Sequence, residues 1–109
     1  MIVQDESPIR KGTPNVPLSV VKEMVRSGKV KTTYTATQGA LELGFVAPVL
    51  PLMCKVVLLL NQGNFYKSMT AYHDETIWHD VYRTRFDERD IYLKLIVKDD
   101  VLIVSFKEL

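Results

Sequence analysis

The fold is decided by the stretch Ile91-Tyr92-Leu93-Lys94-Leu95-Ile96-Val97, Lys98-Asp99-Asp100, Val101-Leu102-Ile103-Val104-Ser105-Phe106-Lys107. Apolar and polar side chains alternate before the acidic pair, and a second apolar-rich run follows it. Such alternation is typical of a strand that is buried on one face. The sequence therefore predicts an antiparallel β-hairpin in which Asp99 and Asp100 form a two-residue loop.

The register of this hairpin follows from the requirement that its apolar side chains share one face. A slip by one residue would bury Lys94 and Lys107, so the predicted register is strongly specified. The predicted pairs are Leu93 with Phe106, Leu95 with Val104 and Val97 with Leu102 on the apolar face, and Tyr92 with Lys107 and Lys94 with Ser105 on the polar face.

A preceding strand is expected to extend both faces of the sheet. A four-residue loop over 87–90 would pair Phe86 with Ile91. The polar face then also contains His79, Arg83 and Arg85, with Arg85 opposite Tyr92, and the apolar face contains Trp78, Tyr82 and Phe86. Asp80 falls on the apolar face, which indicates a bulge or a strand end near it.

Helical patterns dominate the first 60 residues. Ser19 can cap a short helix, and Gly28 ends it. The apolar stripe of this helix consists of Val20, Val21, Met24 and Val25. Thr35 can cap a second helix, which runs through Leu41 and Leu43 and stops at Gly44.

Two further helices are expected before the sheet. Pro51 suits the first turn of an apolar helix over 52–60, although Val56 and Val57 leave a buried strand open. Asn64 is expected to cap the last helix. Its buried face would contain Phe65, Met69 and Tyr72, and its exposed face Tyr66, Lys67 and Thr70.

The domain organisation follows from length and composition. With 109 residues, of which 47% are hydrophobic and 25% charged, the chain is long enough for one globular domain. Residues 1–17 contain three prolines and a glycine, which predicts an extended or mobile N-terminal arm before a single domain over 18–109. The expected class is α+β, with a helical N-terminal half packed on a C-terminal antiparallel β-sheet.

Composition also limits the expected location and ligands. The single cysteine excludes a disulfide framework, and no signal peptide or membrane span is visible, which favours a cytoplasmic protein. One cysteine and two histidines give no zinc spacing, so neither a metal nor a cofactor is expected. The net charge is only +1, although residues 1–32 carry six basic and three acidic side chains. RNA binding would therefore require the basic groups to gather on one face.

The polar face contains side chains that suit phosphodiester cleavage. Cleavage of RNA through its 2′-hydroxyl needs a base, positive charge near the phosphoryl oxygens and an acid for the leaving 5′-oxygen. The candidate residues are Lys67, His79, Arg83, Arg85, Tyr92, Lys94 and Lys107. On these residues alone, a solvated polar face with no catalytic role is the simpler interpretation, and Tyr66 fits rim packing better than a base-stacking role.

The sequence resembles the MqsR family of toxin ribonucleases. The resemblance covers roughly positions 18–109 and is carried by Phe65-Tyr66-Lys67-Ser68-Met69-Thr70, Thr76-Ile77-Trp78, Asp80-Val81-Tyr82-Arg83, Tyr92-Leu93-Lys94 and Val101-Leu102-Ile103-Val104-Ser105-Phe106-Lys107-Glu108. It implies a RelE/YoeB-like bacterial ribonuclease fold and the toxin of a type II toxin–antitoxin pair. It also implies ribosome-independent cleavage of mRNA at GCU-type sites, and the missing ligand cluster predicts that this cleavage needs no metal.

The resemblance also implies roles and partners. By position, the family's catalytic residues fall on Lys67, His79, Tyr92 and Lys107, and RNA-binding roles are expected for Arg83, Arg85, Lys94 and Tyr66. The implied partner is an MqsA-like antitoxin, a zinc-containing helix-turn-helix protein that binds DNA, whereas the toxin alone is not expected to bind DNA or membranes.

One segment and one residue depart from the family pattern. Residues 45–52 contain a short insertion, and His79 replaces a glutamine. Glutamine only positions groups, whereas histidine can transfer a proton. The alternative function is therefore an RNA-binding or antitoxin-binding module in which this change has weakened or abolished cleavage.

Overall fold

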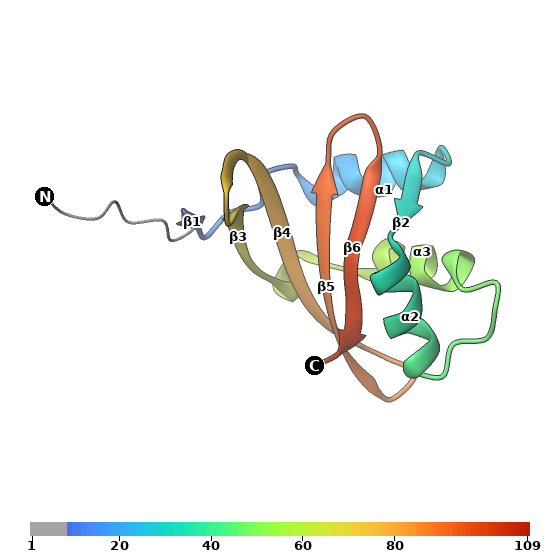
Figure 1. The fold of residues 1–109 in the computed structure, drawn as a ribbon. Coiled ribbons are helices and arrows are strands. Elements are labelled where there is room, and N and C mark those ends of the chain that lie inside the picture. Colours follow the sequence, from blue (N-terminus) through green and yellow to red (C-terminus); the bar gives the residue numbers. More distant parts are fainter. Residues whose placement is uncertain (1–8) are drawn as a thin grey trace, which may run out of the picture.

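The computed structural model describes residues 9–109, which form a six-stranded β-sheet with three α-helices (Figure 1). The spatial order of the strands is β1-β3-β4-β5-β6-β2. The strand bounds are β1 Arg10–Lys11, β2 Val30–Thr32, β3 Phe65–Ala71, β4 Asp74–Phe86, β5 Arg89–Val97 and β6 Val101–Glu108. All neighbours pair antiparallel except β2, which is parallel to β6.

The three helices and a short 3₁₀ turn lie between these strands. Their bounds are α1 Leu18–Arg26, α2 Tyr34–Glu42, α3 Leu50–Leu59 and η1 Gln62–Asn64. The α+β prediction is therefore confirmed, but the N-terminal half is not purely helical, because β1 and β2 join the sheet. None of the helices within residues 9–109 has the length and apolar character that crossing a membrane requires.

The predicted helix caps are partly wrong. Helix α1 begins one residue before Ser19, after Pro17, and has no side-chain cap. Helix α2 is capped by Thr33 and not by Thr35, because the Thr33 side chain accepts a hydrogen bond from the Ala36 N–H. The predicted stops at Gly28 and Gly44 agree with their left-handed backbone, at φ +81° and +95°.

The hydrophobic core lies between the helices and one face of the sheet. Helices α1 and α3 lie behind the sheet in Figure 1, and α2 lies beside β6. The core combines Val21, Ala36, Ala40, Met53, Val56 and Val57 from the helices with Tyr82, Ile91, Leu93, Leu95, Ile103 and Phe106 from the strands. Within residues 9–109 the helices cover only this face, so none of the described helices lies on the other face of the sheet.

Helix α2 covers the edge of β6 where β2 ends. A Cβ atom added to Gly39 would lie 2.0 Å from the Phe106 carbonyl oxygen and 3.5 Å from the Lys107 Cβ. Only glycine permits this close approach between a helix and a strand. Gly39 therefore fixes the helix against the strand that carries Lys107.

The predicted helix over 65–72 is wrong, because these residues form strand β3. The strand pairs with β4 along its length and with β1 at Met69 and Ser68. Its buried face carries the polar side chains of Ser68 and Thr70, so no apolar alternation marks it as a strand. Both hydroxyls have buried roles: Ser68 donates to Asp80, and Thr70 accepts from the Ile9 N–H.

The predicted loop over 87–90 is also wrong. The β4–β5 turn contains only Asp87 and Glu88, both with positive φ, and Arg83 is opposite Tyr92. The register differs by two residues from the predicted one. Because side chains alternate with a period of two, this difference leaves every side chain on its predicted face.

The β5–β6 hairpin agrees with the prediction only in its half far from the turn. Leu93 is opposite Phe106, Tyr92 opposite Lys107 and Lys94 opposite Ser105, as predicted. A bulge next to Lys94 then shifts the register, so that Leu95 is opposite Ile103 and Val97 is opposite Val101. The turn therefore comprises 98–100, and the side chains of Val101 and Ile103 enter the core in place of Leu102 and Val104.

Asp80 lies on the core face within a regular part of β4 and marks no strand end. Its carboxylate is 2% exposed and accepts hydrogen bonds from the backbone N–H groups of Asn15 and Val16, at 2.9 and 3.1 Å, and from the Ser68 hydroxyl. These contacts attach residues 9–17 to the sheet. The predicted arm over 1–17 lies partly outside the described residues, and its extent stays a prediction.

Candidate functional site

Two rows of side chains cross the sheet on the face that the helices leave open. In the first row, Lys67 of β3 is opposite Val81 of β4, which is opposite Lys94 of β5. In the second row, Arg83, Tyr92 and Lys107 lie opposite one another on β4, β5 and β6. Directly opposed residues of a ladder share a face. We call Tyr66, Lys67, His79, Arg83, Tyr92, Lys94 and Lys107 the cationic face.

A β-bulge in β3 places two consecutive side chains on the cationic face. Phe65 is opposite Tyr82 and Lys67 is opposite Val81, so Tyr66 is an additional residue on this strand. The Arg83 guanidinium carbon lies 3.8 Å from the centre of the Tyr66 ring, and the Lys67 Nζ lies 5.2 Å from it. Without the bulge, Tyr66 would point toward the core, and the cationic face would lack this aromatic ring.

The lysines of the cationic face influence one another. Burial lowers the pKa of Lys94, and the positive charges of Lys107 and Lys67 lower it further. The positive charges of Lys67 and Lys107 thus disfavour the charged form of Lys94. A phosphate group would relieve that repulsion, so the face is suited to bind an anion.

His79 of β4 lies on the same face as these three lysines. Burial lowers the pKa of His79, Lys94 lowers it further, and Asp80 opposes the shift. The cation that acts on the His79 ring is therefore Lys94 of the neighbouring strand β5. At neutral pH the ring is therefore mostly unprotonated and can accept a proton.

Tyr92 remains protonated at neutral pH. Burial and the nearby Tyr66 raise its pKa, and Arg83 partly offsets the effect. The Lys107 Nζ lies 5.4 Å from the centre of the Tyr92 ring. The phenol is thus a hydrogen-bond donor held between an arginine and a lysine.

Arg85 is less closely associated with the other candidates. It lies on the same face but nearer the β4–β5 turn, and its guanidinium forms an ion pair with Asp90 at 2.9 Å. Sequence reasoning placed Arg85 opposite Tyr92, whereas Arg83 takes that position. The side chains that lie together are therefore those of the cationic face, with Arg85 at its margin.

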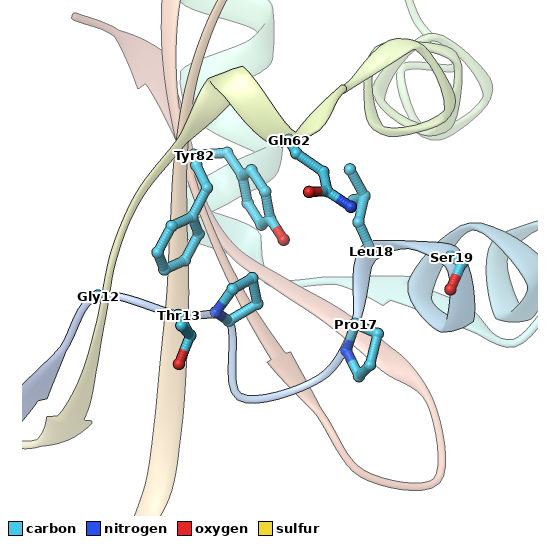
Figure 2. Close-up of a pocket in the computed structure, with 9 residues that line it drawn as sticks. Gly12, Thr13, Pro17, Leu18, Ser19, Gln62 and Tyr82 are labelled. Carbon is cyan, nitrogen blue, oxygen red and sulfur yellow. The ribbon is translucent and has the colours of Figure 1, made fainter.

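A hollow of about 390 Å³ lies on the opposite face of the sheet (Figure 2). It is lined by uncharged side chains from the arm, α1, β3 and β4, including Pro14, Leu18, Phe65 and Tyr82. The Tyr82 hydroxyl points into it without a hydrogen-bond partner among the described residues, and burial with the nearby Asp80 raises its pKa to about 12. This hollow lacks the basic groups that phosphodiester cleavage requires.

One structural residue was missed by sequence reasoning. Asp80 was noted only as an exception to the apolar pattern, yet it holds the arm against β3 and β4. A carboxylate on an apolar face costs free energy unless it is hydrogen-bonded. That cost was the available signal that a distant part of the chain had to supply donors.

Comparison with known proteins places the chain in a family. The sequence model of the family described as "Motility quorum-sensing regulator, toxin of MqsA" matches residues 13–108. The chain is also 50% identical over 100 residues to the mRNA interferase toxin MqsR of Escherichia coli (strain K12), and the match covers 92% of this chain and 99% of that relative. The cationic face lies wholly within the residues that the family model matches.

Proposed function

The chain belongs to the MqsR toxin family, and on this premise we propose that it is a toxin that cleaves mRNA on its cationic face. The observation that supports this proposal most directly is the convergence of three lysines, an arginine, a histidine and two tyrosines from four adjacent strands. Cleavage of mRNA would inhibit translation and growth. We further propose GCU-type specificity, independence of the ribosome and a RelE/YoeB-like relationship of the fold.

The proposed reaction uses the RNA's own 2′-hydroxyl as the nucleophile. His79 removes the hydroxyl proton, and the 2′-oxygen attacks phosphorus while the bond to the 5′-oxygen breaks. Lys67 and Lys107 stabilise the charge on the phosphoryl oxygens, and Tyr92 donates a hydrogen bond to the same group. The departing 5′-oxygen takes a proton from solvent and becomes a 5′-hydroxyl, the other product is a 2′,3′-cyclic phosphate, and His79 returns its proton to solvent.

The remaining residues of the cationic face are assigned to RNA binding. The charges of both Lys67 and Lys107 act on Lys94, and Lys94 would neutralise a phosphate of the RNA. Tyr66, held under the Arg83 guanidinium, offers a flat surface for a base. Arg85 is proposed to contact RNA further from the scissile bond, if a phosphate displaces its ion pair with Asp90.

The family description supports an antitoxin partner for this chain. The family is described as a toxin of MqsA, and we propose that an MqsA-like, zinc-containing helix-turn-helix protein neutralises the toxin in the cytoplasm. The zinc would belong to that partner. No metal or cofactor enters the mechanism proposed for the toxin itself.

Metal-free cleavage tests the proposed reaction. Purified protein should cleave an mRNA that contains GCU sites in EDTA without ribosomes, and the products should carry 2′,3′-cyclic phosphate and 5′-hydroxyl ends. Loss of activity in EDTA that magnesium restores would contradict the mechanism. RNA binding without any cleavage would instead support the alternative of a binding module that has lost catalysis through His79.

Two substitutions test the assignment of the lysines. Lys67→Ala and Lys107→Ala should each lower the cleavage rate by about a hundredfold or more, because each removes charge stabilisation from the transition state. Lys22→Ala, which removes one positive charge from α1 on the other side of the sheet, is the matched control and should keep full activity. Full activity of Lys67→Ala would remove that residue from the site.

A further inference from the structure

The short strand β1 brings an additional arginine to the cationic face. Arg10 is opposite Met69 of β3, and Met69 is opposite His79 of β4. Opposed residues share a face, so Arg10 lies on the same face as His79. The Arg10 side chain is exposed.

The neighbouring lysine faces the other way. Lys11 is opposite the buried Ser68, and its Nζ lies 4.1 Å from the centre of the Trp78 ring. The same Nζ donates a hydrogen bond to the Asn15 side chain at 3.1 Å. Two consecutive cations of the arm therefore lie on opposite faces of the sheet, and only Arg10 adjoins the candidate site.

The position of β1 is held from both of its ends. The Ile9 N–H donates to the Thr70 hydroxyl at 2.8 Å, and the Thr70 N–H donates to the Ile9 carbonyl at 2.9 Å. After β1, the Asp80 carboxylate accepts hydrogen bonds from the backbone N–H groups of Asn15 and Val16. Arg10 is thus carried by anchored backbone and does not depend on its own side-chain contacts.

The spacing of the strands places Arg10 beside the reacting groups and not among them. Adjacent strands are about 4.8 Å apart, so β1 lies roughly 10 Å from β4 and farther from β5 and β6. This separation is too large for Arg10 to contact the phosphate held by Tyr92 and Lys107. It suits a neighbouring phosphate of the same RNA strand.

We propose that Arg10 binds a backbone phosphate that flanks the cleaved bond, so that the N-terminal strand extends the RNA-binding surface. The inference rests on the proposed function and adds a residue to it that precedes the family match at 13–108. A guanidinium binds phosphate through two parallel hydrogen bonds, which suits a positioning contact. Because a phosphate contact carries no base information, Arg10 would affect affinity and not sequence preference.

The test compares two single-charge variants on RNAs of two lengths. Each RNA carries a 2′-deoxynucleotide at the cleavage site, so that binding is measured without reaction. The short RNA spans only the cleavage site, and longer RNAs extend it on the 5′ or the 3′ side. Arg10→Ala should weaken binding of one extended RNA by about fivefold and leave the short RNA unaffected.

The matched control is Lys11→Ala, which removes the same charge one residue away on the other face. It should bind both RNAs as the wild type does. The dependence of log affinity on log salt for the extended RNA should become shallower by about 0.7 in Arg10→Ala, because one phosphate contact is lost. Trp78 is the single tryptophan and lies against the arm, so unchanged fluorescence will show that β1 remains docked in Arg10→Ala.

The outcomes separate this inference from the proposed function. Equal binding by Arg10→Ala and the wild type would overturn the role of Arg10, even if the wild type cleaves RNA as proposed. Equal weakening by Arg10→Ala and Lys11→Ala would also overturn it, because net charge would then explain the effect. Failure of the wild type to cleave any RNA would contradict the proposed function itself.

Discussion

Histidine at position 79 gives the cationic face a group that can titrate near neutral pH. Burial and Lys94 lower the pKa of His79 below its ordinary value of 6.5. The neutral ring then predominates at neutral pH, as a general base requires. The same shift means that acid protonates His79 only at a pH lower than usual.

The dependence of the cleavage rate on pH will test this role. In the wild type, the rate should fall as the pH decreases through a value below 6.5, because the base becomes protonated. His79→Gln should remain active, since Lys67, Tyr92 and Lys107 are unchanged, but it should lose this inflection. Both profiles are measured on one oligonucleotide; identical curves would show that His79 only positions the substrate.

Asp80 is the second residue for which the structure predicts the effect of a substitution, here on stability. Asp80→Asn keeps the shape of the side chain but replaces one acceptor oxygen by a donor NH₂ group, which faces the N–H groups of the arm. The variant should lose about 2–4 kcal/mol of unfolding free energy, because buried groups lose their partners. Urea unfolding measures the loss.

The control for this substitution is Asp99→Asn in the exposed β5–β6 turn, which should be close to neutral. Detachment of the arm in Asp80→Asn should also free the backbone at Arg10 and Lys11 from β3, so that trypsin can cleave it. An Asp80→Asn protein with wild-type stability and wild-type resistance to trypsin would show that the carboxylate does not hold the arm.

At the level of single elements, the contact of α2 with β6 depends on one glycine. Gly39→Ala would bring a Cβ to 2.0 Å from the Phe106 carbonyl, so the helix or the strand must move. We expect a loss of about 1–3 kcal/mol of stability, which thermal unfolding measures. The cleavage rate of the folded variant should fall as well, because Lys107 follows Phe106 on the displaced strand.

Gly12→Ala is the matched control for this substitution. An added Cβ at Gly12 meets no atom within 4 Å, so the stability of the protein should change little. If Gly39→Ala were as stable and as active as Gly12→Ala, the contact between α2 and β6 would have no role in positioning Lys107.

The sequence predicted those elements whose pattern depends on apolar side chains. Helix α1 and the distal half of the β5–β6 hairpin each have a single apolar face, and α3 is apolar along its whole length. The same reasoning failed for β3, because the buried face of this strand carries Ser68 and Thr70. Their partners are Asp80 and the backbone at Ile9, which are distant in sequence, so local patterning could not reveal them.

Irregular backbone explains the other differences between the predicted and the observed fold. The β4–β5 turn places Asp87 and Glu88 at positive φ without a glycine, so no usual hairpin signal was present. In the candidate site, the polar alternation of β5 and β6 was sufficient to place Tyr92 opposite Lys107. The position of Lys67 beside them required the β3–β4 pairing, and the sharing of a face by Tyr66 and Lys67 required a bulge that no sequence feature announced.

At the level of the whole molecule, the net charge of +1 conceals an asymmetric surface. The cationic face should make RNA binding sensitive to salt, since each phosphate contact with single-stranded RNA contributes a slope of about −0.7 in log affinity against log salt. Three contacts, from Lys67, Lys94 and Lys107, predict a slope of about −2 for a short uncleavable RNA.

Titration of that RNA at several salt concentrations measures the slope. Lys67→Ala should reduce its magnitude by about 0.7, whereas Lys22→Ala should leave it unchanged. A slope near zero in the wild type would show that the lysines do not contact phosphates.

The arrangement of the strands also affects whether copies of the molecule can pair through the edges of their sheets. The two edge strands, β1 and β2, have only two and three residues, and the four long strands lie between them. Beyond β2, helix α2 covers β6, and the part of β3 that β1 leaves unpaired contains the bulge at Tyr66. Long free edges promote aggregation through intermolecular strand pairing. The described sheet offers little template for such pairing, so copies of the protein should not associate through their strand edges.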